Sequence, residues 1–266
     1  MSLKIPEFKT DKELFTYLKE NKEDLIYQKK AEFKKADAFC ANVVQLKDGL
    51  TTKSENTDTE VIKVRPIINT TMYRDSHKDV HINGLWKKSL DENKRIKHLQ
   101  EHQMAFNKVI ADKEDLKAFT KIYNWRDLGY DVDGKTEALV FDSTIKRSRN
   151  PEMFKEYKDG NVDNHSVGMY YVKIALAMDS DDEDDKEEKA VFDKYIEDIA
   201  NKEEVKKDKY FWAVYEAKVI EGSAVPMGSN PITPTLEADT KSLLNDNEES
   251  DEATLQMKGI INFLKS

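Results

Sequence analysis

The sequence predicts a mainly β protein with flanking helices, in the α+β class, and two observations carry that prediction. The first is a set of runs rich in Val, Ile, Tyr and Phe, which have the composition and alternation of strands. These runs are VIKVRPIINTTMY at 61–73, KIYNW at 121–125, ALVFDSTI at 138–145, NHSVGMYYVKIAL at 164–176 and YFWAVYEAKV at 210–219. The second is a set of charged helical segments before and between these runs. Short strands at short spacing favour a barrel-like domain.

Composition narrows the class of protein. The chain has 266 residues, of which 38% are hydrophobic and 36% charged, and this suits one large domain with appendages. No apolar run approaches the roughly 20 residues that a membrane helix needs. Cys40 is the only cysteine, so no internal disulfide can form, and the net charge of -9 argues against broad nucleic-acid binding. We expect a protein of a reducing cytoplasm, with no membrane segment and no nucleic-acid partner.

Residues 1–58 are predicted to form an N-terminal helical arm and a linker. Thr10 and Glu13 have the spacing of a capping box, and apolar residues follow at helical spacing. The pattern stays helical but Lys-rich over 25–39, which indicates an amphipathic helix with limited apolar area. Residues 45–60 are polar and lack a period, so we expect a linker there.

The domain proper is predicted over residues 59–235. Pro66 within the first strand-like run indicates an edge strand or a bulge. Asn150 and Pro151 are a helix N-cap and a first helical residue, and Gly160 suits the helix end. We predict an acidic C-terminal tail over 236–266, with a helix near 253–264 inside it.

An acidic helical insertion is predicted at about 179–209. Its first part, DSDDEDDKEEK, has the acidic spacing of a calcium-binding EF-hand loop. However, the glycine position of that loop holds Asp184 and the final Glu position holds Ala190. We therefore expect a solvated acidic loop that leads into a charged helix.

Ser166 lies at the mouth of the run at 164–176. On a strand it shares a face with Gly168, where the missing side chain would leave room for an approaching peptide. Ser166 is thus a candidate nucleophile. The alternative is a polar residue that merely begins a buried strand.

Histidines supply two alternatives for the chemistry. Residues 95–102 alternate as a strand does, which would place His98 and His102 on one strand face. The string HLQEH at 98–102 also matches the H-x-x-E-H pattern of zinc peptidases, in which a helix brings both imidazoles to one metal. A zinc hydrolase using His98 and His102 is therefore one hypothesis.

The other hypothesis is a catalytic triad. Glu221 continues the apolar strand face that ends at Val219, and a buried carboxylate needs a hydrogen-bonding partner unless Gly222 breaks the strand and lets it reach solvent. Serine needs a neighbouring base to lose its proton, and an acid that orients the base improves it. Ser166, His102 and Glu221 would then be nucleophile, base and orienting acid.

Four motifs, in order along the chain, resemble those of the prohead (capsid maturation) serine proteases of tailed phages. That family is related in fold to the herpesvirus assemblins, and the resemblance covers about residues 61–235. The motifs are DVHINGLWKKSL before the histidine, KHLQEHQ around it, NHSVGMYY around the serine and VIEGSAVPMGSNP around the glutamate. The resemblance implies that Ser166, His102 and Glu221 are the catalytic residues.

The chain also departs from the family pattern. Gln103 follows the histidine where the family often has an acid, and Lys108-Val109-Ile110 stands where Ile-Gly is common. The insertion makes the spacing between Ser166 and Glu221 long, so the third role stays open between Glu221, His165 and Asp163. As the neighbour of Ser166 on a strand, His165 would point to the opposite face.

The resemblance further implies an assemblin-type barrel and a serine endopeptidase that needs no cofactor or metal. Its substrates would be the major capsid protein and the scaffold protein of a bacteriophage. Cleavage would occur inside the immature capsid (prohead) in the host cytoplasm during virion assembly, together with autoproteolysis. A homo-oligomer stays open, and so does a non-catalytic capsid assembly or scaffold protein that keeps the fold.

Overall fold

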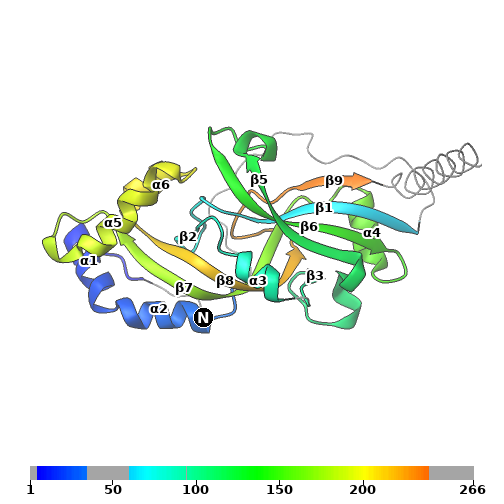
Figure 1. Ribbon diagram of the computed structural model, residues 1–266, viewed down its shortest axis with the longest axis horizontal. Helices are drawn as coiled ribbons and strands as arrows, with labels where there is room; N and C mark the ends of the chain where they lie inside the picture. Colours follow the sequence, from blue (N-terminus) through cyan, green and yellow to red (C-terminus); the bar gives the residue numbers. More distant parts are fainter. Residues whose placement is uncertain (1–4, 35–59, 94, 240–266) are drawn as a thin grey trace, which may run out of the picture.

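The computed structural model describes residues 5–34, 60–93 and 95–239, which form an α+β structure built on two sheets (Figure 1). Within these described ranges, one sheet has four strands and the other has five. The strands of the described residues form no closed barrel, whereas the strand spacing favoured a barrel-like domain. Instead, side chains of both sheets meet in one apolar core, which includes Phe141 of one sheet and Val167 of the other.

The four-stranded sheet has the order β5-β6-β1-β9 and is antiparallel throughout. Its strands are β1 (Val61–Thr70), β5 (Leu116–Asn124), β6 (Lys135–Lys146) and β9 (Thr235–Asp239). Pro66 lies in an inner strand, at a register shift against β9, as the bulge prediction required.

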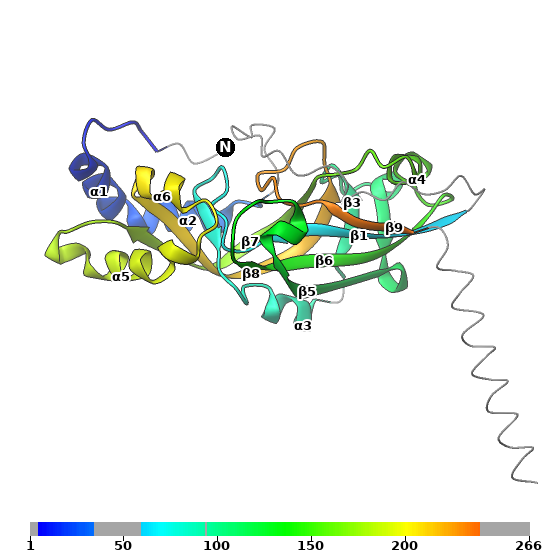
Figure 2. The same cartoon turned by 90° about the horizontal axis from the view of Figure 1, so that it is seen from above.

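In the five-stranded sheet, β8 (Tyr210–Ala224) is central. β7 (His165–Met178) pairs antiparallel with β8 along one edge. The other edge of β8 takes two short parallel strands, β2 (Asp79–His81) and then β3 (Lys97–Gln100). β4 (Val109–Asp112) extends the sheet beyond β3. Figures 1 and 2 show β7 and β8 as a long two-stranded ribbon with the N-terminal helices at one end.

Six α-helices surround the sheets within the described ranges. They are α1 (Asp11–Glu20), α2 (Lys22–Ala31), α3 (Lys87–Glu92), α4 (Pro151–Lys158), α5 (Lys186–Tyr195) and α6 (Lys202–Asp208). Both reciprocal bonds of the predicted capping box at Thr10 and Glu13 are present, and Asn150 caps α4. No helix in the described ranges has the length and apolarity to cross a membrane.

The N-terminal arm is shorter as a helix, and more firmly packed, than predicted. α2 ends at Ala31, because the chain is extended from Glu32 and Lys34 pairs with β7. Leu18 and Leu25 are buried in the core that also contains β7 side chains. The predicted continuation of the helix over 35–39 and most of the linker lie outside the described residues.

A buried ion pair joins the arm to the domain. The ammonium of Lys29 contacts a carboxylate oxygen of Asp79, and the two side chains are 2% and 0% exposed. The second Asp79 oxygen accepts a hydrogen bond of 2.8 Å from the Tyr171 hydroxyl. Burial alone would raise the pKa of the Asp79 carboxyl, but the nearby Lys29 ammonium holds it below its ordinary value.

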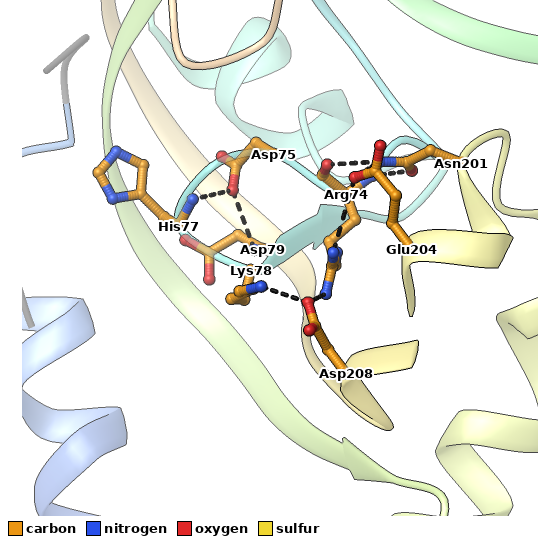
Figure 3. A network of polar contacts seen from close by, with 8 residues as sticks. All are labelled: Arg74, Asp75, His77, Lys78, Asp79, Asn201, Glu204 and Asp208. Atoms are coloured by element: carbon orange, nitrogen blue, oxygen red, sulfur yellow. Dashed lines mark hydrogen bonds and ion pairs between the residues drawn. The ribbon is translucent and has the colours of Figure 1, made fainter. Parts of the chain in front are cut away.

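The predicted insertion follows β7 and contains α5 and α6, and its acids are not all solvated. Asp185 is 4% exposed and lies between the Ser180 hydroxyl and the Lys19 ammonium, at 2.6 Å and 2.8 Å. Figure 3 shows how α6 holds the loop before β2: Asp208 contacts Arg74 and Lys78. This is the loop that leads to Asp79.

The C-terminal tail was predicted to begin at residue 236. This residue falls inside β9, which pairs with β1 and brings Asp239 opposite Lys63. Residues just before β9 are fully buried, including Ile232 and Thr233. Residues 240–266, including the predicted helix at 253–264, lie outside the described part of the chain.

We predict that Lys29→Met lowers the free energy of unfolding by about 3–5 kcal/mol, because it leaves the Asp79 carboxylate buried without its cation. Urea unfolding measures this loss. Lys30→Met, an exposed neighbour on the same helix, is the matched control and should stay within about 0.5 kcal/mol of wild type. The double variant Lys29→Met/Asp79→Asn should recover part of the loss, and equal losses in the single and double variants would contradict this account.

Candidate active site

β8 brings the three candidate residues of the triad to one region. Over residues 221–224 it pairs with β3 on one edge and with β7 on the other. Glu221 lies in β8 itself, Ser166 is the second residue of β7, and His102 follows β3 by two residues. Segments separated by the whole acidic insertion therefore meet at the end of one strand.

The register of β7 on β8 decides which side chains share a face. Ser166 lies opposite Ser223, and Gly168 lies opposite Glu221. Residues directly opposite one another in an antiparallel pair project to the same face, so these four residues share one face. We call it the Ser166 face. On the other face, a side chain at Gly222 would collide with Phe141.

A bulge places Glu221 on the Ser166 face. Gly168 pairs with Glu221, but the next residue, Met169, pairs with Val219, so Ile220 is an extra residue in β8. Because Gly168 and Met169 project to opposite faces, Glu221 and Val219 do too. The predicted continuation of the apolar face from Val219 to Glu221 is therefore wrong, and β8 continues to Ala224 without a break at Gly222.

The Glu221 carboxylate is completely buried and receives a hydrogen bond on each oxygen. Nδ1 of His102 donates to Oε1 at 2.6 Å, and the Ser223 hydroxyl donates to Oε2 at 2.6 Å. The backbone N–H of His102 in turn donates to the Ser223 hydroxyl oxygen at 3.0 Å. These bonds offset the cost of removing the carboxylate from water and fix the orientation of the imidazole.

The backbone around His102 is unusual. Glu101 and His102 both have positive φ angles, 52° and 57°, in the left-handed region. Histidine is among the few side chains that are enriched there. The N–H of Glu101 still bonds Ala224 at 2.9 Å, so the chain turns away only after β3 has finished pairing with β8. Such backbone conformations cost energy and cluster at functional sites.

The missing side chain of Gly168 leaves space for Glu221, whereas the sequence analysis expected it to leave room for an approaching peptide. A Cβ atom at this position would lie 1.8 Å from Oε1 of Glu221 and 2.6 Å from the Phe33 ring. The space above Gly168 is thus filled by the carboxylate and by a side chain of the N-terminal arm. Glycine is required here so that Glu221 can approach the strand and reach His102.

The helix that the zinc hypothesis requires is absent from the HLQEH string, which forms β3 and the start of a turn. His98 is fully buried, with Nδ1 at 2.9 Å from the Ser143 hydroxyl and Nε2 at 3.0 Å from the Tyr157 hydroxyl. Both of its ring nitrogens are therefore engaged within the core. The described residues contain no group of three or more His, Cys, Asp or Glu arranged to hold a metal.

His165 belongs to the same buried network as His98. Its Nδ1 donates to the Thr233 carbonyl oxygen at 2.8 Å, and its Nε2 lies 2.9 Å from the Tyr157 hydroxyl. Burial lowers the pKa of His165 to about 4 and that of His98 well below its ordinary value. Both rings are therefore neutral, so Tyr157 donates to His165 and accepts from His98.

Of the three residues considered for the third position, only Glu221 has a hydrogen bond to His102 in the described contacts. His165 projects to the face opposite Ser166, and Asp163 is exposed. The sequence prediction missed Ser223, which orients both Glu221 and the turn at His102. Its position two residues after Glu221, on the same strand face, was the available signal.

Comparison with known proteins gives no relative. No family model, no curated protein and no solved structure matches the chain. Functional proposals therefore depend on the geometry of this site and on the sequence motifs.

We predict that acid destabilises the fold through its buried histidines. A histidine with a lowered folded-state pKa is protonated more readily when unfolded, so the free energy of unfolding falls as pH falls. For His165, with a pKa of about 4, the loss between pH 7 and pH 4 is about 3 kcal/mol. Urea unfolding at several pH values between about 6.5 and 4 measures it.

The variant His165→Asn assigns this pH dependence to His165, because its amide can still donate to the Thr233 carbonyl but does not titrate. This variant should have a shallower dependence of unfolding free energy on pH than wild type, whatever its stability at pH 7. An unchanged pH slope would contradict the assignment of His165 as a neutral, buried residue.

Proposed function

We propose that this protein is a serine endopeptidase with Ser166 as nucleophile, His102 as general base and Glu221 as orienting acid. The observation that supports it most is the hydrogen bond between His102 Nδ1 and the buried Glu221 carboxylate, on the face that Ser166 shares. Bonding of Nδ1–H to Glu221 selects the imidazole tautomer in which Nε2 carries the lone pair. That tautomer is the one a serine hydroxyl needs as its base.

The mechanism is acyl transfer. The Ser166 hydroxyl oxygen attacks the carbonyl carbon of the scissile peptide, and His102 takes the hydroxyl proton. When the tetrahedral intermediate collapses, His102 gives that proton to the leaving amine, and an acyl-enzyme ester remains on Ser166. Water, deprotonated by His102, then attacks the ester, and the proton returns to Ser166. Glu221 stabilises the charged imidazole during both steps, and backbone N–H groups near Ser166 bind the oxyanion.

The sequence motifs support a more specific role. The segments around Ser166, His102 and Glu221 resemble those of the prohead serine proteases, so we extend the proposal to an assemblin-type fold and to capsid maturation in a bacteriophage. The substrates would be the major capsid protein and the scaffold protein, cleaved within the prohead, with autoproteolysis as a further reaction. We propose no cofactor, no nucleic-acid partner and no membrane association.

We predict that Ser166→Ala abolishes cleavage without unfolding the protein, because a missing triad nucleophile costs on the order of a million-fold in turnover. The assay is mass spectrometry of the purified protein, and of scaffold and capsid proteins expressed with it. Ser148→Ala, an exposed serine outside the site, is the control and should cleave as wild type does. Equal cleavage by the Ser166→Ala variant would end the serine-protease proposal, and absence of all cleavage by folded wild type would favour the scaffold alternative.

We predict that Glu221→Gln reduces turnover about 10⁴-fold, because an amide cannot select the same imidazole tautomer or stabilise its charge. The melting temperature should change little, since the amide keeps the shape of the acid and the geometry of the site. Glu216→Gln is a matched control on the same strand, where the carboxylate pairs at 2.8 Å with the exposed ammonium of Lys173. Near-wild-type turnover in Glu221→Gln would remove Glu221 from the mechanism.

A further inference from the structure

The end of the N-terminal arm lies along the outer edge of β7, beside the Ser166 face. Lys34 and Met169 form an antiparallel bridge with two backbone bonds: Lys34 N–H to Met169 O at 2.9 Å, and Met169 N–H to Lys34 O at 3.1 Å. Because the inner edge of β7 is paired with β8, the arm adds to the remaining edge. The bridge is three residues from Ser166.

The side chains of this segment alternate as those of a bound strand do. Phe33 lies over Gly168 and packs against the Tyr170 ring, with 5.2 Å between the ring centroids. Lys34 projects to the other face, where its ammonium lies 5.7 Å from the centre of the Tyr171 ring. The aromatic residue therefore lies on the Ser166 face, and the basic residue lies on the opposite face.

The arm is fixed in this position by contacts far from the edge. The buried pair of Lys29 and Asp79 holds α2, and Leu18 and Leu25 are packed in the core. Only two residues separate α2 from the bridge at Lys34. The fold thus delivers an extended segment of the chain itself to the strand that begins with Ser166.

The antiparallel pairing fixes the direction in which the arm segment runs along β7. β7 runs away from Ser166, and the arm is antiparallel to it, so at Lys34 the arm is directed toward the Ser166 end of the strand. A peptide bound in the same way would reach Ser166 with residues that follow the bridge. Its aromatic residue would then lie on the amino-terminal side of the scissile bond.

We propose that the outer edge of β7 is the peptide-binding site of the protein and that Glu32–Lys34 of the arm is its intramolecular occupant. The ligand class is an extended peptide with an aromatic residue followed by a basic one. Backbone bonds to Met169 provide affinity, and the aromatic contact with Gly168 and Tyr170 provides selectivity, as in other cases of strand addition to a sheet edge. A substrate must displace the arm before it can bind.

Occupation of the β7 edge by the arm lowers the apparent affinity for an external peptide. A tethered segment acts at an effective concentration of about millimolar, so it competes strongly with a peptide of similar sequence. The apparent affinity for an external peptide is reduced by the fraction of molecules in which the edge is open. Variants that weaken the arm contact should therefore bind external peptide more tightly.

The test uses two arm variants, Phe33→Ala and Lys34→Pro, in the full chain. The first removes the ring over Gly168, and the second removes the N–H that bonds Met169. Tyr27→Ala is the matched control, because Tyr27 is an aromatic residue of the same arm that is 73% exposed. All carry Ser166→Ala so that a bound peptide stays intact. Far-UV circular dichroism checks folding, and since the variants remove different parts of the contact, either one decides the question.

The probe is a fluorescein-labelled peptide with the sequence of residues 30–36, Lys-Ala-Glu-Phe-Lys-Lys-Ala, and the readout is fluorescence anisotropy. Phe33→Ala and Lys34→Pro should bind it at least tenfold more tightly than the Tyr27→Ala and arm-intact proteins. Replacing Phe by Ala in the peptide should weaken binding to the open variants at least tenfold. Equal affinity in all proteins, or no binding by the folded arm variants, would overturn the proposal.

The consequence for turnover rests on the proposed function and is tested separately with Ser166 present. Arm variants that bind the peptide and also cleave faster than Tyr27→Ala support both proposals. If the arm variants bind the peptide but never cleave a protein substrate, the peptide-binding proposal stands and the protease proposal is contradicted. If neither arm variant changes the rate of cleavage, the protease proposal stands. The proposal that the arm occupies the substrate-binding edge of β7 is then contradicted.

Discussion

The Glu221 carboxylate has no contact with solvent, and its burial is tolerated because His102 and Ser223 each donate a hydrogen bond to it. Several features of the backbone make this arrangement possible. The bulge at Ile220 turns Glu221 onto the face of Ser166, and the absent side chain at Gly168 leaves it space. The parallel pairing of β3 with β8 then delivers the turn that carries His102.

The N-terminal arm and the acidic insertion, which look like appendages in the sequence, are coupled to this site through ion pairs. α6 holds the loop before β2 through Asp208 (Figure 3). That loop leads to Asp79, which pairs with Lys29 of the arm. With Lys29 in place, the arm ends at the edge of β7 with Phe33 over Gly168. The insertion therefore helps to position a segment that lies beside Ser166, although the insertion itself is at the far end of the β7–β8 ribbon.

Local sequence patterns predicted most helices and strands. The features that they did not predict depend on pairing between segments that are distant in the sequence. The alternation of β-branched residues placed the main strands, the Thr10–Glu13 capping box placed α1, and Ser166, His102 and Glu221 came from strand ends and motifs. The bulge at Ile220 was not predictable, because nothing in the residues 219–221 distinguishes strict alternation from a two-against-one pairing. The strand at β9 and the extension at Glu32 also depend on partners distant in sequence, β1 and β7. Propensity alone favours a tail and a longer helix there.

The central claim is that Ser166 is activated by the His102–Glu221 pair, and covalent capture of the serine tests it most directly. A small fluorophosphonate reacts with an activated serine and leaves a phosphonyl ester that tandem mass spectrometry can place on one residue. For wild type and Phe33→Ala, the account predicts a single adduct on Ser166, formed faster when Phe33 is absent, and loss of that adduct in His102→Ala. Folded protein that carries no adduct on Ser166, or that labels Ser166 equally without His102, would contradict it.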